Sequence, residues 1–167
     1  MRSLSRLPTF ILLSVALLIA ALLIKRTEAT SSDQPTNRVE LGSQLHMGGL
    51  DFAAAQQTLL IFSNSSCQYC LDELSFYRRL LRERDSADHS TAIVMLSAEP
   101  TQAFSQFVTR NGLGSAKIAS IKSGDLGVRI VPTIVLADRS GIVLKVWTGK
   151  QSNATEVAIL KATGASQ

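Results

Sequence analysis

The stretch Leu59–Leu74, "LLIFSNSSCQYCLDEL", decides the fold of this 167-residue chain. Residues 58–63 form a short, continuous apolar run, which is typical of a strand buried on both faces. From Cys67 onward the apolar side chains recur at helical spacing, which predicts one helix that starts at this cysteine. We expect Ser65 or Ser66 to cap that helix by accepting a hydrogen bond from a backbone N–H group.

The rest of the chain alternates strand-like and helix-like patterns. In chain order these are a strand at 91–97, a helix at 101–112 ending on Gly112, a short strand at 116–121, a hairpin of 132–138 and 141–147, and a helix at 152–163 capped by Ser152 or Asn153. Strand–helix–strand units predict a parallel core, and the hairpin adds antiparallel pairing. The sequence therefore predicts an α/β fold, with a mixed central sheet and helices on both of its faces.

An uncharged apolar run, Leu7–Ile24, precedes this domain and would form a helix about 27 Å long. Basic residues flank the run on both sides, and the small-residue pattern Thr27-Glu28-Ala29 allows signal cleavage. We expect residues 1–26 to be an uncleaved membrane anchor; a cleaved signal and a buried helix of the domain are the alternatives. Residues 27–40 are polar and predict a flexible linker, so the folded domain is expected to span 41–167.

The net charge of +4 comes from the ends of the apolar run and not from the domain. The chain has 17 basic and 13 acidic residues, and without Arg2, Arg6, Lys25 and Arg26 the basic count falls to 13. A nucleic-acid-binding domain carries a basic face in its folded part. Nucleic acid is therefore not an expected partner.

The two cysteines, Cys67 and Cys70, are too close in sequence for a stabilising bridge. A disulfide stabilises most when it closes a long loop, and this pair encloses two residues. The position favours a bond that is made and broken, because a helix start stabilises the thiolate of Cys67. Cys70, one turn later, is placed to attack the resulting mixed disulfide and release the partner.

Metal-binding interpretations of the cysteine pair find little support elsewhere in the sequence. A zinc site needs two more ligands, and His46 and His89 are the only histidines. Haem attachment needs a histidine directly after the second cysteine, where the chain has Leu71. Copper binding by the dithiol remains an alternative. We expect no cofactor and no resident metal.

The CxxC stretch, followed about 60 residues later by "LGVRIVPTIVLADRSGIV" (126–143), resembles the membrane-anchored, thioredoxin-like thiol–disulfide oxidoreductases of the TlpA/ResA type. The similarity covers residues 58–149. It implies a thioredoxin-like fold behind an N-terminal transmembrane anchor. It also implies catalytic roles for Cys67, Cys70, Glu73 and Pro132.

The resemblance further implies a cis peptide between Val131 and Pro132, beside Cys67. The backbone of Val131 would then pair with an incoming substrate peptide. Glu73 would influence proton transfer near the dithiol. Tyr69, between the cysteines, is expected to contact partners or tune the redox potential.

Two departures from the family pattern bear on the chemistry. Ser66 stands where the family usually has tryptophan, and Ile61 stands where thioredoxins proper place a buried acid. Without that acid, Glu73 or water would have to accept the proton of Cys70.

The expected function is that of a membrane-tethered enzyme whose catalytic domain faces the periplasm or an equivalent exported space. It would exchange its dithiol with disulfides of exported cysteine-containing proteins, such as apocytochrome c, most simply as a reductase. A membrane electron donor would re-reduce it. The alternatives are a disulfide oxidase or isomerase, and a copper-binding or copper-delivery module.

Overall fold

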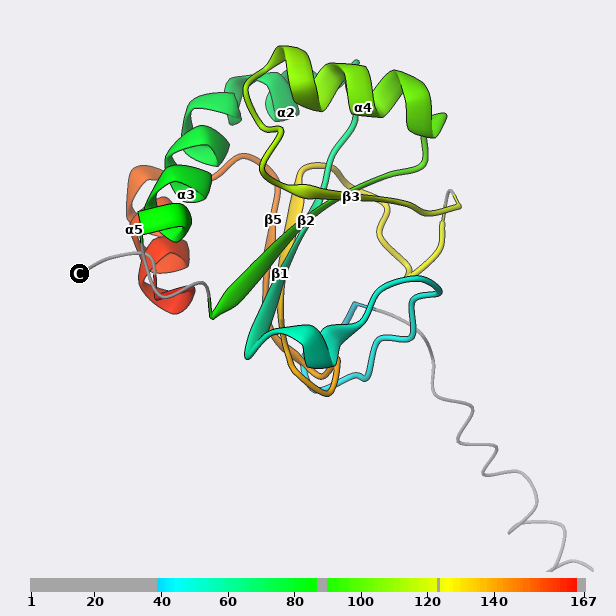
Figure 1. Cartoon of the computed structure of the whole chain (residues 1–167), viewed down its shortest axis with the longest axis vertical. Coiled ribbons are helices and arrows are strands. Elements are labelled where there is room, and N and C mark those ends of the chain that lie inside the picture. Colours follow the sequence, from blue (N-terminus) through cyan, green and yellow to red (C-terminus); the bar gives the residue numbers. More distant parts are fainter. Residues whose placement is uncertain (1–38, 87–89, 123, 165–167) are drawn as a thin grey trace, which may run out of the picture. The chain divides into compact units, whose positions relative to one another are not determined.

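A five-stranded mixed sheet forms the centre of the fold (Figure 1). The computed structural model describes residues 39–86, 90–122 and 124–164. The strands are β1 (Gln57–Phe62), β2 (Thr91–Ser97), β3 (Lys117–Ser120), β4 (Thr133–Asp138) and β5 (Val143–Thr148), in the spatial order β3-β2-β1-β4-β5. β1 pairs in parallel with β2 and antiparallel with β4. The predicted parallel core, the short strand and the hairpin are confirmed.

The predicted membrane anchor lies outside the described residues, as does most of the predicted linker. In the part of the chain that the structure describes, no helix combines the length and apolar character needed to cross a membrane. The domain boundary at residue 41 stays a prediction.

Three of the four α-helices in the described residues cover one face of the sheet. The α-helices are α2 (Gln68–Asp72), α3 (Leu74–Ser86), α4 (Thr101–Arg110) and α5 (Asn153–Ala162). Side chains alternate along a strand, and Leu59 and Ile61 of β1 pack in one cluster with residues of α3, α4 and α5. The helical members of this cluster are Phe76, Tyr77, Leu80, Leu81, Phe104, Phe107, Val108, Ile159 and Leu160.

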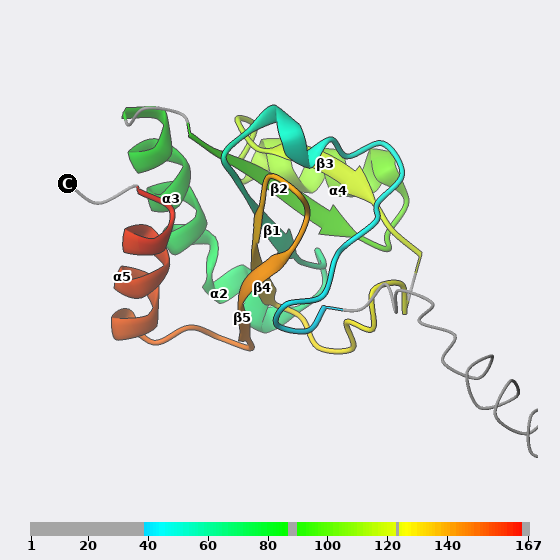
Figure 2. The same cartoon turned by 90° about the horizontal axis from the view of Figure 1, so that it is seen from below.

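The opposite face of the sheet is covered without an α-helix in the described residues. Leu60 and Phe62 of β1 pack there against Leu45, Leu126 and Phe52, which belongs to the short 3₁₀ helix η1 (Phe52–Ala54). Figures 1 and 2 show the segment that contains η1, in cyan, on the side away from α3 and α5.

The prediction of helices on both faces is therefore wrong for the α-helices. The β1–α3–β2 and β2–α4–β3 connections step across the sheet in the same direction. Right-handed crossovers that step the same way place their helices on the same face. Strand order, which the sequence did not reveal, decides this point.

The segment 42–45 is joined to the turn of the β4–β5 hairpin. Leu45 N–H donates to the carbonyl of Gly141 at 2.8 Å, and Val143 N–H donates to Ser43 at 2.9 Å. Gly141 has a φ of +79°, and a Cβ there would lie 2.9 Å from the Leu45 carbonyl oxygen. Only glycine fits this turn without displacing the segment that closes the second face.

One edge of the sheet collects the segments that carry the predicted chemistry. Parallel β1 and β2 end at this edge, and antiparallel β4 begins there. The cysteine-bearing loop after β1, Glu99 after β2, and Val131–Pro132 before β4 are therefore brought together, as expected where parallel strands end side by side.

Candidate active site

Cys67 occupies the N-cap position of α2 and is partly exposed. Its sulfur accepts a hydrogen bond from the backbone N–H of Cys70 at 3.4 Å. The cysteine thus caps its own helix, and the prediction that Ser65 or Ser66 does so is wrong. Both serines have other partners: Ser66 bonds to Asn64 Oδ1 through its N–H and hydroxyl, and Ser65 bonds to Glu99.

The helix after Cys67 is interrupted at Glu73, where a single helix was predicted. Glu73 is the C-cap of α2, and its N–H donates to the carbonyl of Leu71 instead of continuing the α-helical ladder. The chain re-enters a helix at once, because Tyr77 N–H donates to the Glu73 carbonyl at 3.0 Å. The interruption lies at the residue whose side chain binds the backbone N–H of Gln151, outside its own helix.

Cys70 is fully buried directly behind Cys67, and both cysteines are free thiols. Burial raises the pKa of the Cys70 thiol to about 12, and its interaction with Cys67 adds to the rise. The backbone of Asn64 and the hydroxyl of Ser63 oppose the rise. A thiol with such a pKa stays protonated near neutral pH, so it needs a base and a donor to its anion before it can attack a disulfide.

The loop before β4 faces the exposed thiol. The Val131–Pro132 peptide is cis, as the sequence resemblance implied. The Cys67 thiol lies within hydrogen-bonding distance of the Val131 carbonyl oxygen, at 3.5 Å. Pro132 is buried, and its carbonyl accepts a hydrogen bond from Gly149 N–H at 2.7 Å. The backbone beside Cys67 is therefore also held by the residue that follows β5.

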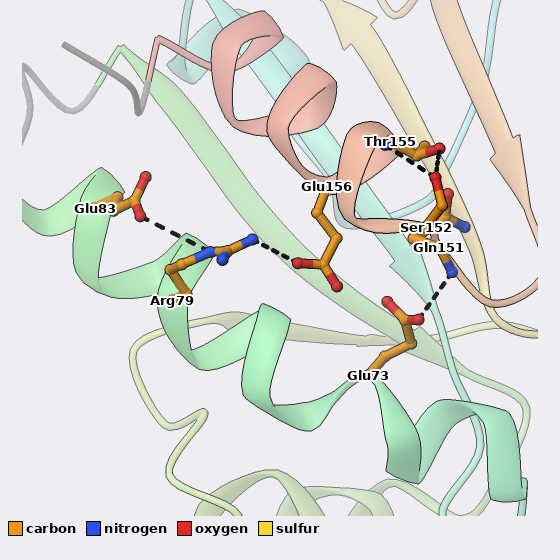
Figure 3. A network of polar contacts seen from close by, with 7 residues as sticks. All are labelled: Glu73, Arg79, Glu83, Gln151, Ser152, Thr155 and Glu156. Atoms are coloured by element: carbon orange, nitrogen blue, oxygen red, sulfur yellow. Dashed lines mark hydrogen bonds and ion pairs between the residues drawn. The ribbon is translucent and has the colours of Figure 1, made fainter.

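Glu73 is a buried carboxylate that binds the loop before α5 (Figure 3). Its Oε1 accepts a hydrogen bond from the backbone N–H of Gln151 at 2.8 Å, whereas its Oε2 has no partner in the described residues. Burial raises the pKa of Glu73, and the Gln151 hydrogen bond opposes this rise. The charge of Glu156 raises it further. A carboxyl with a raised pKa can exchange a proton closer to neutral pH.

The charges around Glu73 come from two other elements. Glu156 of α5 forms an ion pair with Arg79 of α3, and Figure 3 shows the Arg79 guanidinium between Glu156 and Glu83. Lys150 forms an ion pair with Asp72 at 2.9 Å and lowers the pKa of Glu73. The predicted Ser152 cap of α5 is confirmed, since its hydroxyl accepts from Thr155 N–H. Glu73 is thus bound by the loop before α5, and charges in that loop and on α5 act on its pKa.

Tyr77 places a second titratable group in the same interior. Its side chain is buried, and its hydroxyl has no hydrogen-bond partner in the described residues. Burial raises its pKa, and the charges of Cys70 and Glu73 raise it further. Cys70, Glu73 and Tyr77 follow at spacings of three and four, which places them along one side of the helical backbone. Helical periodicity alone could have pointed to this tyrosine.

Tyr69 is the most exposed of the predicted site residues, with 61% of its surface accessible. Ile130, next to Val131, is also exposed, at 57%. Tyr69 lies two residues after Cys67. Ile130 directly precedes Val131, whose carbonyl contacts the Cys67 thiol. Both side chains offer apolar surface beside the accessible thiol.

Glu99 is a site residue that the sequence reasoning missed. Its carboxylate accepts hydrogen bonds from Ser65 N–H at 2.8 Å, from the Ser65 hydroxyl at 2.5 Å and from the Ser97 hydroxyl at 3.1 Å. The sequence did contain a signal for Glu99, because the carboxyl ends of adjacent parallel strands meet at the same edge of a sheet. A carboxylate just after the second strand could therefore have been expected near the loop after the first.

The described residues contain no group of three or more His, Cys, Asp or Glu side chains placed to hold a metal ion.

No protein-family model and no curated protein matches the chain, but solved structures do. A thiol-disulfide isomerase from Corynebacterium glutamicum is 16% identical, with a TM-score of 0.54, over 79% of this chain and 98% of that one. StoA from Bacillus subtilis is 23% identical, with a TM-score of 0.50, over 60% of this chain and 79% of that one. A secreted disulfide oxidoreductase from Mycobacterium tuberculosis is 15% identical, with a TM-score of 0.51, over 66% and 82%.

These similarities define the class of fold: the domain is a thioredoxin-like α/β fold with a five-stranded mixed sheet. The predicted fold class is confirmed at this level. At these identities the similarity establishes the fold alone, and the chemistry must be argued from the site.

Proposed function

We propose that the chain is a protein thiol–disulfide oxidoreductase that works by reversible oxidation of Cys67 and Cys70. One observation carries the proposal: an accessible thiol caps a helix, and a fully buried thiol lies behind it, its backbone N–H 3.4 Å from the first sulfur. Because only one thiol of the pair is accessible, Cys67 can attack a substrate disulfide, and Cys70 can then release the substrate from the mixed disulfide. The names of the structural neighbours, an isomerase and a disulfide oxidoreductase, support the same chemistry.

The reaction follows from this asymmetry in two steps. The Cys67 thiolate attacks a substrate disulfide, forming a mixed disulfide and releasing one substrate thiolate, which takes up a proton. Cys70 then gives its proton to the Glu73 carboxylate and attacks Cys67 Sγ. The Cys67–Cys70 disulfide forms, and the second substrate thiolate leaves and is protonated. The dithiol loses two electrons and the substrate disulfide gains them.

The substrate would bind as an extended strand beside Val131. The Val131 carbonyl lies against Cys67, and its N–H makes no backbone hydrogen bond in the described part of the chain. The N–H is therefore available for main-chain pairing, and the carbonyl becomes available when the Cys67 thiol loses its proton, so a peptide that presents its disulfide to Cys67 can pair with both. Tyr69 and Ile130 would supply apolar contacts on either side.

We further propose that the enzyme is exported and tethered by residues 1–26, and that it acts as a reductase. The uncharged run Leu7–Ile24 supports the tether, and the secreted neighbour supports export. Its substrates would be exported cysteine-containing proteins, apocytochrome c among them. A membrane electron donor would return the disulfide to the dithiol.

A trapping experiment tests the activity. The purified wild type should reduce the interchain disulfides of insulin with dithiothreitol as electron source, and Cys67→Ser should abolish this activity. Cys70→Ser should instead accumulate a mixed disulfide through Cys67, visible on non-reducing gels and lost on reduction. Wild-type protein that does not accelerate insulin reduction would refute the proposal.

The direction of exchange is tested separately in cells. Acid-quenched thiol labelling of a reductase should find mainly dithiol, and an oxidase mainly disulfide. An isomerase should rearrange scrambled ribonuclease in vitro. Stoichiometric copper on reduced protein purified without chelator, with no trapped partner, would favour the metal module instead.

A further inference from the structure

A buried hydroxyl lies next to the resolving thiol and has no structural partner. Ser63 directly follows β1 and is 3% exposed. Its backbone N–H donates to Leu96 at 2.9 Å, but its Oγ makes no hydrogen bond of ordinary geometry in the described residues. Burying an unpaired hydroxyl costs stability, so such a group invites a functional explanation.

The surroundings of this hydroxyl point to the dithiol. The backbone of Asn64 and the Ser63 hydroxyl both act against the burial that raises the pKa of the Cys70 thiol, so both favour its anion. Ser63 also lines a cavity of about 170 Å³, together with Asn64, Val131 and Arg129. Ser63 thus acts on the buried thiol and shares a cavity with Val131, whose carbonyl lies against Cys67.

We propose that the Ser63 hydroxyl is the side-chain hydrogen-bond donor that, beside the backbone N–H of Asn64, stabilises the Cys70 thiolate while Cys70 resolves the mixed disulfide. The inference rests on the proposed thiol–disulfide exchange and assigns a new residue to it. The proton of Cys70 still passes to Glu73, and Ser63 keeps its own proton throughout. Its O–H turns toward the sulfur as the negative charge develops and turns away once the Cys67–Cys70 bond has formed.

The other side chains near Cys70 are poorly suited to this role. Cys67 is bonded to the substrate at this stage and has no proton to donate, and Glu73 serves as the proton acceptor and shows no hydrogen bond to either sulfur in the described residues. The Tyr77 hydroxyl is buried near both, but it shows no hydrogen bond to either sulfur. Glu156 and Lys150 act on Glu73 from the α5 side, and Arg129 lines the cavity without a bond to the thiol. The backbone N–H of Asn64 is a second donor that favours the Cys70 anion, and among the side chains Ser63 is the one that acts in the same direction.

The test follows the two thiols separately by stopped-flow absorbance. Reduced protein is mixed with an aromatic disulfide that releases one coloured thiolate when Cys67 attacks and a second when Cys70 resolves. Ser63→Ala should leave the first phase unchanged. It should slow the second phase about tenfold near pH 7, as expected for one lost hydrogen bond to a charged group, and move its pH midpoint upward. Ser63→Thr, which keeps the hydroxyl and can place its methyl in the cavity, should restore the second phase.

Thr58→Val is the matched control. Thr58 carries another buried hydroxyl without a partner, at the opposite end of β1, so this variant makes the same chemical change away from the dithiol. An unchanged second phase in Ser63→Ala, equal slowing of both phases, or equal slowing in Thr58→Val would overturn the proposal. Insulin reduction by the wild type distinguishes this failure from failure of the exchange activity itself.

Discussion

The carboxylate of Glu99 accepts two hydrogen bonds from Ser65, one from the Ser65 N–H at 2.8 Å and one from the Ser65 hydroxyl at 2.5 Å. Ser65 lies two residues before Cys67, so the end of β2 holds the loop that presents the accessible thiol. Hydrogen bonds to an ionised acceptor are stronger than neutral ones. The position of the reactive sulfur therefore depends on Glu99, which lies 34 positions after Ser65 in sequence.

Glu99→Ala should lower the free energy of unfolding by about 2 kcal/mol, because three donors lose their acceptor. Glu99→Gln keeps one acceptor oxygen and should lose less. Urea unfolding monitored by circular dichroism measures both. Ser66→Ala, which removes only an exposed hydroxyl bonded within the same loop, serves as the control. An unchanged free energy of unfolding in Glu99→Ala would show that the hydrogen bonds from Ser65 and Ser97 to Glu99 contribute nothing to stability.

Glu73 should make stability depend on pH in a definite direction. Its folded-state pKa is raised above the unfolded value, so the native state holds this proton more tightly. Stability should therefore fall as the pH rises from the unfolded pKa, about 4.3, through the folded one. Glu73→Gln cannot ionise, and the difference between its unfolding curves and those of the wild type should grow over this range. The same variant should slow resolution by Cys70. A difference that is constant with pH would mean that Glu73 is not perturbed.

The raised pKa of Cys70 should make the reduced protein less stable at alkaline pH. The reduced native state keeps its thiol protonated up to about pH 12, whereas the unfolded chain ionises near 9. The native state binds the extra proton between these values, so its stability should fall as the pH rises above about 9. Relative to Cys70→Ala, the reduced wild type should lose about 1 kcal/mol between pH 9 and 10. Parallel curves for the two proteins under reducing conditions would contradict this expectation.

Tyr77→Phe should leave stability unchanged or raise it by about 0.5–1 kcal/mol. The substitution keeps the buried ring and its contact with Phe76, and it removes a hydroxyl that has no partner. Thermal unfolding of the two proteins gives the comparison. A loss above about 1 kcal/mol would show that the hydroxyl is bonded in solution.

Local features of the site could be predicted from the sequence. The apolar run of β1, the spacing of Cys67 and Cys70, and the proline-containing loop are each encoded within a few residues. The cis peptide and the contact between Val131 and Cys67 agree with the resemblance those residues carry. The catalytic roles assigned to the individual residues remain predictions.

Features that depend on strand order or on distant partners could not be predicted in the same way. Ser65 or Ser66 was expected to cap a helix, but the Ser65 hydroxyl bonds to Glu99, which comes near it only when β1 and β2 pair. Glu73 was expected near the dithiol, but nothing near it in sequence indicates that Gln151 binds it. The placement of all three large helices on one face follows from the direction of the crossovers, which composition does not encode.

The hydrogen bond between Glu73 and Gln151 also has a consequence during biosynthesis. The two residues are 78 positions apart, so at about 5–20 residues per second the ribosome completes Gln151 several seconds after Glu73. During that interval the emerging polypeptide already carries both thiols, while the carboxylate that should serve Cys70 has no fixed position. Cys70 is not yet buried in that chain, so both thiols would react as ordinary exposed ones, and ordered attack and release would begin only once α5 has docked.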